Sequence, residues 1–235
     1  MSEASDRLNW YGRRQGHKLK PGRARLVDTL LPRLRVPVPA GGGVLDPAGL
    51  FSRPLADLWF EVGFGGGEHL AEQAKAHPDI GFIGCEPFVN GVASLLHLID
   101  EGDLDNVRLL DDDARPLLTA LPEASIGRLF VLFPDPWPKR RHHRRRFVSP
   151  PNLDLMARVL KDGAELRFAS DHMDYVRWTL FHAGRHPAFE WTAERPDDWR
   201  RRPADGFPTR YEAKALTGSA CLYLSFRRKT RGYSS

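Results

Sequence analysis

Short apolar runs alternate with amphipathic segments along most of the chain after residue 56. Five of the runs predict buried strands, at residues 58–62, 81–86, 106–110, 128–133 and 165–170. The segments between and after them predict helices, at residues 69–78, 92–102, 114–121, 150–163 and 172–184. Two antiparallel strands are predicted in the tail, within residues 189–194 and 219–228. This alternation predicts an α/β fold, a Rossmann-like doubly wound sheet that is mostly parallel and has antiparallel edge strands.

The first 50 residues differ from this pattern. Residues 1–35 hold nine Lys or Arg against three acids, and six of these cations fall within RRQGHKLKPGRAR, residues 13–25. A stretch rich in proline and glycine follows at residues 36–49 and has the composition of a linker or loop. We therefore expect residues 1–50 to be a basic N-terminal arm and linker, and residues 51–235 to be the main domain.

The overall composition is that of a globular protein with an excess of positive charge. Of the 235 residues 41% are hydrophobic, and the formal net charge of +5 raises the question of a polyanionic partner. Cys85 and Cys221 fit neither a disulfide framework nor a Cys/His zinc site, so no metal is expected. The polar N-terminus and the lack of a long apolar run predict a soluble cytoplasmic protein with no membrane partner.

An acidic residue stands at or just past the end of each of the five predicted strands. These acids are Glu61, Glu86, Asp113, Asp135 and Asp171. Ligands of doubly wound sheets bind beyond the carboxyl ends of the strands, so one acid at every strand end outlines a site. Taken singly, each acid has a plainer interpretation, such as a helix N-cap for Asp113 or Asp171 and a rigid turn for Asp135.

The first acid begins a glycine-rich turn, EVGFGGG, at residues 61–67. Gly63 and Gly65 would let the backbone approach a ligand closely. The dinucleotide fingerprint G-x-G-x-x-G is incomplete, because Glu68 occupies the third glycine position. The pattern E-x-G-x-G suits S-adenosylmethionine, a cationic cofactor, with a loose turn as the alternative. Glu86 would accept ribose hydroxyls in either class of cofactor site.

The fourth strand runs into FPDPWPKRRHHRRRF, residues 133–147, where prolines on both sides of Asp135 restrict the backbone. Cations follow directly, in a basic run made of Lys139, Arg140, Arg141, His142, His143, Arg144, Arg145 and Arg146. A charge run is often only a solvated loop. Here it contains no acid and adjoins a candidate site, so we predict that it binds phosphates of a polyanion.

Together these segments carry a resemblance. EVGFGGG, FIGCEPFVNGVASLL, NVRLLDDDA, LFVLFPDPWPKRRHHRRRFV, FASDHMDYV and TRYE, with YGRRQGHKLKPGRARL before them, resemble the bacterial tRNA (guanine-N7-)-methyltransferase family. The resemblance covers residues 10–226 and implies a class I methyltransferase fold with a methyltransferase domain at residues 51–235. The chain departs from the family at Ala213-Lys214-Ala215, where arginine and glycine often follow, and at residues 87–90, where other branches place a histidine.

The resemblance also implies roles for individual residues. The residues implied in binding S-adenosylmethionine are Glu61, Gly63, Gly65, Glu86, Asp113 and Asp135, and the catalytic assignment falls on Asp135. Guanine contacts are implied for Lys139, Asp171, Thr209, Arg210, Tyr211 and Glu212. Contacts to RNA are implied for Arg141, His142, His143, Arg144, Arg145 and Arg146. The partner is then tRNA, while a monomer and a homodimer both stay open.

The chemistry of guanine N7 agrees with this set of residues. N7 carries an in-plane lone pair and no proton, so its methylation requires alignment with the methyl group and no general base. Asp135 is then expected to position the reaction and to favour the positive charge that develops on guanine. Two alternatives stay open: a methyltransferase for another nucleic-acid atom, and a non-catalytic RNA-binding protein on the same fold.

Overall fold

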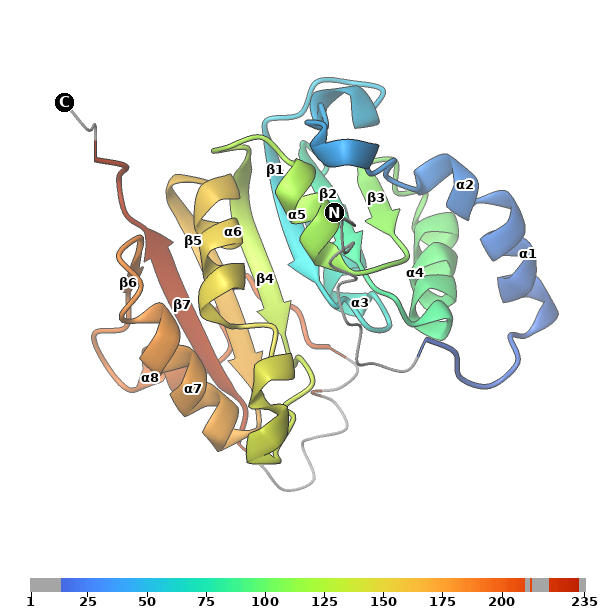
Figure 1. Cartoon of the computed structure of the whole chain (residues 1–235). Coiled ribbons are helices and arrows are strands. Elements are labelled where there is room, and N and C mark those ends of the chain that lie inside the picture. Colours follow the sequence, from blue (N-terminus) through green and yellow to red (C-terminus); the bar gives the residue numbers. More distant parts are fainter. Residues whose placement is uncertain (1–13, 210–211, 213–219, 233–235) are drawn as a thin grey trace, which may run out of the picture.

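The computed structural model describes residues 14–209, 212 and 220–232. It contains a seven-stranded sheet in the order β3-β2-β1-β4-β5-β7-β6 (Figure 1). In chain order the strands are β1 (Asp57–Val62), β2 (Ile80–Cys85), β3 (Val107–Leu110), β4 (Ile126–Leu132), β5 (Leu160–Ser170), β6 (Phe189–Trp191) and β7 (Leu222–Arg228). The first five are parallel, and β7 is antiparallel to both β5 and β6. The predicted mostly parallel sheet with antiparallel edge strands is confirmed.

Helices cover both faces of the sheet, as the burial of successive residues in β1 requires. Phe60 belongs to the apolar core shared with α5 (Ala114–Ala120), α6 (Pro150–Val159) and α7 (Met173–Ala183). The adjacent Trp59 points to the other face and belongs to the core shared with α3 (Glu68–Ala76) and α4 (Val89–Gly102). In Figure 1, α6 and α7 lie on the near side of the sheet.

The strand order reverses its direction at β1, which pairs with β2 on one side and with β4 on the other. The last residue of β1, Val62, is level with Cys85 of β2 and with Val131 of β4. The segments that follow these three strands therefore leave the sheet at one edge. In a doubly wound sheet this is the place where a crevice opens for a ligand.

Part of the segment expected as an arm and linker is folded against the domain. Its two helices, α1 (Pro21–Thr29) and α2 (Leu31–Leu34), bury Leu26, Leu31 and Leu34 in the core on the α4 side. The backbone N–H of Val36 then donates to Leu109 on β3 at 2.9 Å. Two short 3-10 turns follow, η1 (Ala40–Gly42) and η2 (Ala48–Leu50). The prediction of an arm followed from the cations in this segment and did not take account of the leucines between them, which are buried.

The predicted helix at residues 150–163 is too long by one turn. The chain becomes extended at Leu160, which begins β5 and pairs with Ile126. Gly163 was expected to end the helix, but it takes a φ of +79° within β5, where the register with β4 shifts. Sequence alone did not separate a helix-ending glycine from a glycine in a bulge, because both require a positive φ.

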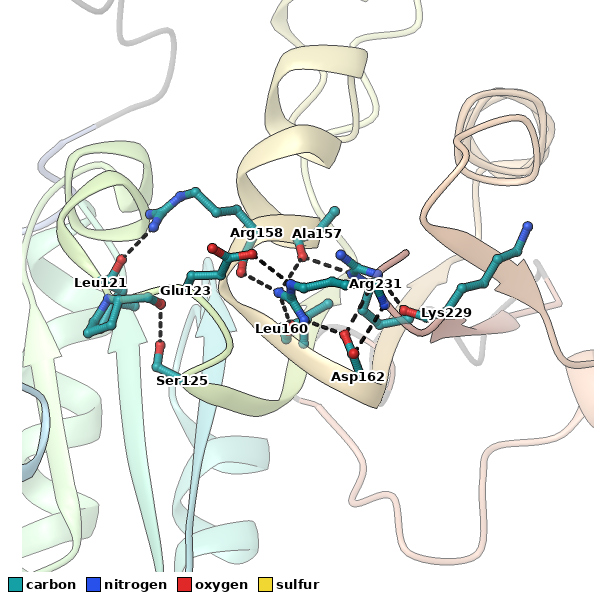
Figure 2. A network of polar contacts seen from close by, with 11 residues as sticks. Leu121, Glu123, Ser125, Ala157, Arg158, Leu160, Asp162, Lys229 and Arg231 are labelled. Atoms are coloured by element: carbon teal, nitrogen blue, oxygen red, sulfur yellow. Dashed lines mark hydrogen bonds and ion pairs between the residues drawn. The ribbon is translucent and has the colours of Figure 1, made fainter. Parts of the chain in front are cut away.

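Arginines cap the carboxyl ends of two helices at the edge of the sheet away from the predicted site. Arg158 donates to three carbonyl oxygens at the end of α5, those of Leu118, Thr119 and Leu121, at 2.6, 2.9 and 2.8 Å. Arg231 does the same for α6, with the oxygens of Ala157, Arg158 and Leu160 at 3.3, 2.8 and 2.8 Å. Figure 2 shows Arg231 reaching Asp162 and Glu123 as well. These bonds satisfy carbonyl groups that a helix end leaves without an intrahelical partner.

Replacing Arg158 with methionine is expected to lower the free energy of unfolding by about 2–4 kcal/mol, because three charge-assisted hydrogen bonds are lost while the aliphatic packing stays. Urea unfolding followed by circular dichroism measures this change. The matched control is Arg33→Met, since Arg33 is exposed on α2. Equal stability of the two variants would contradict the capping role.

Candidate active site at the carboxyl ends of the strands

The turn after β1 is built from glycines with left-handed backbone geometry. Gly63, Gly65 and Gly67 have φ values of +69°, +57° and +82°, which side chains rarely adopt. Around Gly63 and Gly65 a methyl group would meet no atom within 4 Å, so the turn is open on that side. At Gly67 the same methyl group would lie 2.7 Å from Leu95, so this glycine serves close packing on α4. The two glycines predicted to face a ligand are the two that border open space.

Glu86 fastens this turn to the segment after β2. One carboxylate oxygen accepts the N–H of Gly65 at 2.8 Å, and the other accepts the N–H of Phe88 at 2.9 Å. Burial raises the pKa of Glu86, and the nearby charges of Asp135 and Glu61 raise it further against these two hydrogen bonds. Three of the predicted acids therefore act on one another, which makes the crevice strongly negative. Such a cluster favours a cationic ligand.

Glu61 is buried and held by a chain of polar side chains that the sequence analysis did not identify. Gln73 donates through Nε2 to the carbonyl oxygen of Asp205 at 2.8 Å, so this atom is a donor. The same Nε2 lies 3.3 Å from Nε2 of His69, which must accept. The proton of His69 is therefore on Nδ1, where it donates to Glu61 at 2.8 Å. The imidazole of His69 thereby orients the Glu61 carboxylate from behind.

Asp113 performs in this structure the capping role that was its plainer interpretation. Its carboxylate accepts the backbone N–H of Arg115 at 2.8 Å at the start of α5, and it forms an ion pair with the Arg115 guanidinium. Asp113 also lies close to Cys85, at the end of β2. Burial raises the pKa of the Cys85 thiol most, and the charge of Asp113 raises it further. Asp113 thus borders the same crevice as Glu86, and its cofactor role stays a prediction.

Asp135 stands in a turn whose backbone is restricted on both sides. Phe133 and Trp137 take positive φ values of +48° and +44°, uncommon for aromatic residues, and the two prolines lie between them. Asp135 is exposed, yet the protein around it excludes enough water to raise the pKa of its carboxyl. Within the described chain no hydrogen-bond donor reaches this carboxylate. A carboxylate held in a strained turn with free lone pairs is preorganised for a ligand.

The basic run forms a 3-10 turn, η3 (Arg140–Arg145), directly beyond Asp135. Lys139, Arg140, Arg141 and Arg144 are exposed, while His142, His143 and Arg145 are partly buried. The guanidinium of Arg145 lies over the ring of Trp137, 4.9 Å from its centroid. Apart from Arg146, the run has the exposure that a phosphate-binding loop requires.

Arg146 is the exception in this run. Its side chain is 0% exposed, and its guanidinium bonds to the carbonyl oxygen of Pro136 and to Asp174 on α7. It lies over the rings of Tyr175 and Trp178 as well. The RNA contact predicted for Arg146 needs an exposed guanidinium, which this geometry does not provide. The sequence could not show this, because a buried arginine and an exposed one look alike within a run of cations.

A second part of the site lies on the face of the sheet near β5 and β7. A small open cavity of about 30 Å³ is lined there by residues of the predicted guanine set, Thr209 and Glu212, together with His69, Arg202 and Tyr223. Glu212 is buried and accepts from Arg202 at 2.8 Å and from the hydroxyl of Tyr223. Because His69 lines the cavity and also bonds Glu61, the cavity adjoins the glycine turn.

The remaining predicted guanine contacts are placed as follows. Thr209 and Glu212 are joined by two hydrogen bonds. The backbone N–H of Thr209 donates to the Glu212 carboxylate at 3.3 Å, and the backbone N–H of Glu212 donates to the Thr209 hydroxyl at 3.0 Å. Asp171 and Glu212 both lie near Cys221, since burial raises the pKa of the Cys221 thiol and the charges of both carboxylates raise it further. At the start of α7 the backbone N–H of His172 donates to the hydroxyl of Ser170. This bond is therefore made by Ser170 and not by Asp171, for which a helix N-cap was the plainer interpretation. Arg210 and Tyr211 lie outside the described residues.

Two other kinds of site were searched for in the described ranges. Residues 14–209, 212 and 220–232 contain no group of three or more His, Cys, Asp or Glu side chains arranged to hold a metal ion. None of the helices within these ranges combines the length and apolar content needed to cross a membrane.

Known proteins match this chain over most of its length. Residues 56–223 match a family described as "Putative methyltransferase". A tRNA (guanine-N(7)-)-methyltransferase of Rhodospirillum rubrum is 59% identical over 94% of this chain and 88% of its own length. One of Paramagnetospirillum magneticum is 52% identical, with 97% of this chain and 96% of the relative covered.

Solved structures agree on the fold. A 16S rRNA methyltransferase matches with a TM-score of 0.54 at 19% identity, covering 75% of this chain and 90% of that one. A S-adenosylmethionine-dependent O-methyltransferase of Thermotoga maritima matches with a TM-score of 0.52 at 16% identity, covering 89% of this chain and 73% of that one. At these identities the likeness extends to the architecture of the sheet and its helices.

Proposed function

Since the chain belongs to the tRNA (guanine-N(7)-)-methyltransferase family, we propose that it transfers a methyl group from S-adenosylmethionine to N7 of a guanine in tRNA. The observation that carries the proposal is the cluster of Glu61, Glu86 and Asp135 around an open glycine turn at the switch point of the sheet. A tRNA substrate in turn supports a cytoplasmic location for the reaction.

The residues present fit S-adenosylmethionine. Open space above Gly63 and Gly65 leaves room for a ligand against the backbone, where any side chain would intrude. The ligand's ammonium and sulfonium groups complement Glu61 and Asp135, and Glu86 has lone pairs left for ribose hydroxyls. We assign Asp113 to the adenine side of the same crevice. When bound, the cofactor supplies an electrophilic methyl group.

The protein's part in the reaction is then one of alignment and electrostatics. Guanine N7 has a lone pair and no proton to lose, so none of the carboxylates needs to act as a base. Holding N7 in line contributes, in favourable cases, on the order of 7–11 kcal/mol. Asp135 adds a negative charge beside the site where guanine becomes cationic.

The surface around this small cavity, where Arg202, Thr209 and Glu212 lie, is our candidate for the guanine-binding site. A guanine offers N1–H and the N2 amino group as adjacent donors, which one carboxylate can accept together. Glu212 lines this cavity. Among the described residues, its Oε2 accepts a 3.3 Å bond from Thr209 alone, whereas Oε1 accepts from both Arg202 and Tyr223. We assign Glu212 to the base and keep Asp171, Lys139, Arg210 and Tyr211 as further contacts.

Exposed cations are placed to hold the rest of the tRNA. The loop of Lys139, Arg140, Arg141 and Arg144 adjoins Asp135, so phosphates bound there would bring a nucleotide toward the crevice. Such contacts do not depend on base identity, so the choice of guanine falls to the pocket and to RNA shape.

Transfer of labelled methyl from S-adenosylmethionine to unmodified tRNA, with identification of the modified nucleoside, tests the proposal. We expect 7-methylguanosine. A different methylated nucleoside would support action on another atom. Binding of tRNA without methyl transfer would support the non-catalytic RNA-binding alternative, and either result contradicts the proposed function.

Cofactor affinity is expected to fall as the pH is lowered from neutrality through the raised pKa of Glu86. The carboxylate must be ionised to complement the ligand, and below that pKa the affinity should drop by about tenfold per pH unit. The effect on folding has the opposite sign: the raised pKa contributes stability below the ordinary value of about 4, and this contribution is lost as the pH rises through the raised pKa. Calorimetric titration with S-adenosylmethionine measures the affinity. Glu86→Gln should bind S-adenosylmethionine more weakly, and its affinity should vary less with pH. If the affinity of this variant varied with pH as in the wild type, groups other than Glu86 would cause the pH dependence.

A further inference from the structure

Both ends of the loop that carries the basic run are fastened to one helix, α7. At the first end, Nε of Arg146 donates to the carbonyl oxygen of Pro136 at 2.9 Å, and Nη2 bonds Asp174. At the second end, the N–H of Val148 donates to the hydroxyl of Tyr175 at 3.1 Å, and the indole N–H of Trp178 donates to the carbonyl oxygen of Val148 at 2.6 Å. The loop between these two points is therefore held as a unit.

The first of these fastenings acts directly on Asp135. Pro136 is the next residue, and its carbonyl belongs to the peptide group between Pro136 and Trp137, so the bond from Arg146 fixes the turn on the carboxyl-terminal side of Asp135. The turn has positive φ values at Phe133 and Trp137, a geometry that persists only where the surroundings impose it. Asp135 has no hydrogen-bond donor of its own within the described chain, so its orientation depends on its backbone.

Stability alone does not explain an arginine in this position. Its Nη1 is buried and has no hydrogen-bond partner among the described residues, which is unfavourable for folding. The planar guanidinium nevertheless bonds a carbonyl and a carboxylate at fixed angles while it stacks on Tyr175 and Trp178, at 4.9 and 5.1 Å from their ring centroids. Lysine would keep the charge but not this geometry.

We propose that Arg146 is a positioning residue, which holds the Asp135 turn in its reactive geometry by linking Pro136 to Asp174 on α7. It acts through Asp135 and does not contact the RNA. The proposal rests on the proposed function for its effect on catalysis, and on the contacts alone for its effect on the loop. It assigns different tasks to neighbours in one basic run: the exposed cations bind phosphate and the buried one sets the catalytic turn.

Arg146→Lys is the first variant to test. We expect kcat to fall by about 10–100-fold, since small displacements of reacting groups have effects of this size. The KM for tRNA and the slope of its dependence on salt should stay as in the wild type. Arg144→Gln is the matched comparison from the exposed part of the run, and it should raise KM and lower the salt slope by about one while kcat holds.

Asp174→Asn is the second variant. The side chain of Asp174 is half-exposed, whereas that of Arg146 is buried, so we expect this variant to fold even where a change at Arg146 does not. It should lower kcat by about 3–10-fold, and combining it with Arg146→Lys should add little, as expected for two parts of one contact. A raised KM and a reduced salt slope in Arg146→Lys would overturn the proposal in favour of an RNA contact. A fall in melting temperature with an unchanged kcat per cofactor-binding molecule would overturn it in favour of a purely structural role.

Amide hydrogen exchange tests the same proposal without the reaction. In Arg146→Lys we expect faster exchange confined to residues 135–148, and unchanged exchange in this segment would overturn the proposal even if kcat fell. The wild-type protein in the methyl-transfer assay reports separately on the function: its failure to form 7-methylguanosine would contradict the proposed activity and leave the exchange result to decide on Arg146.

Discussion

Replacing Asp135 with alanine is expected to lower kcat for tRNA methylation by about 10²–10³-fold, with tRNA affinity nearly unchanged. The loss follows from removing a preorganised charge beside the atom that becomes positive, for which effects of this size are usual. Asp135 is the one strand-end acid in the exposed, strained turn, and no hydrogen bond within the described chain ties its carboxylate to another task. Single-turnover kinetics with saturating S-adenosylmethionine separate this loss from weaker cofactor binding.

Asp135→Asn sharpens the same test, because it keeps the shape of the side chain and removes its charge. We expect it to be nearly as slow as the alanine variant. Asp100→Asn, an equivalent change at an exposed acid of α4, serves as the control and should keep wild-type rates. Wild-type turnover in Asp135→Asn would show that the charge of Asp135 plays no part in catalysis.

Replacing Gly91 with alanine is expected to weaken the binding of S-adenosylmethionine by at least about 100-fold. A methyl group on Gly91 would lie 2.1 Å from the carbonyl oxygen of Gly65, far inside contact distance, so the glycine turn or α4 must move. Movement of the turn would break the 2.8 Å bond between the Gly65 N–H and Glu86 and distort the open surface at Gly63. Calorimetric titration measures the affinity, and circular dichroism checks that the variant is folded.

The control for this change lies on the same helix. Gly102 ends α4, and the three atoms nearest to a methyl group there would all belong to the flexible side chain of Leu104, the first of them at 3.2 Å. Gly102→Ala should therefore bind the cofactor like the wild type. If Gly91→Ala also bound normally, the turn after β1 would have to be free to shift, and the rigid cradle described above would be wrong.

Local patterns predicted most of the fold because they reflect local physics. The largely apolar run at residues 128–133 became β4 (Ile126–Leu132), since a strand covered on both faces is apolar along most of its length. The pattern was less informative where one residue type serves two structures. Gly163 was read as a helix end and proved to lie within β5, and the leucines of α1 and α2 were hidden among cations.

For the candidate site, too, some residues could be predicted from the sequence and others could not. The strand-end acids were found because the carboxyl ends of parallel strands must meet at one edge of the sheet, whatever the details of packing. Their supports were not found. His69 and Gln73 stand one helical turn apart on a buried helix face, which is a detectable signal, but it does not identify Glu61 and the backbone of Asp205 as their partners.

The sequence by itself determined the order of strands and helices, the row of acids at the strand ends and the basic run beyond Asp135. These follow from residue spacing, because periodicity and turn chemistry act over a few residues. Only the tertiary structure decided which cation of the run is buried, how Glu61 is oriented and which side chains surround Glu212. Those outcomes depend on contacts such as that of Gln73 with Asp205, 132 positions apart, and of Arg146 with Asp174, 28 apart. Contacts of that kind exist only once the sheet has brought distant segments together.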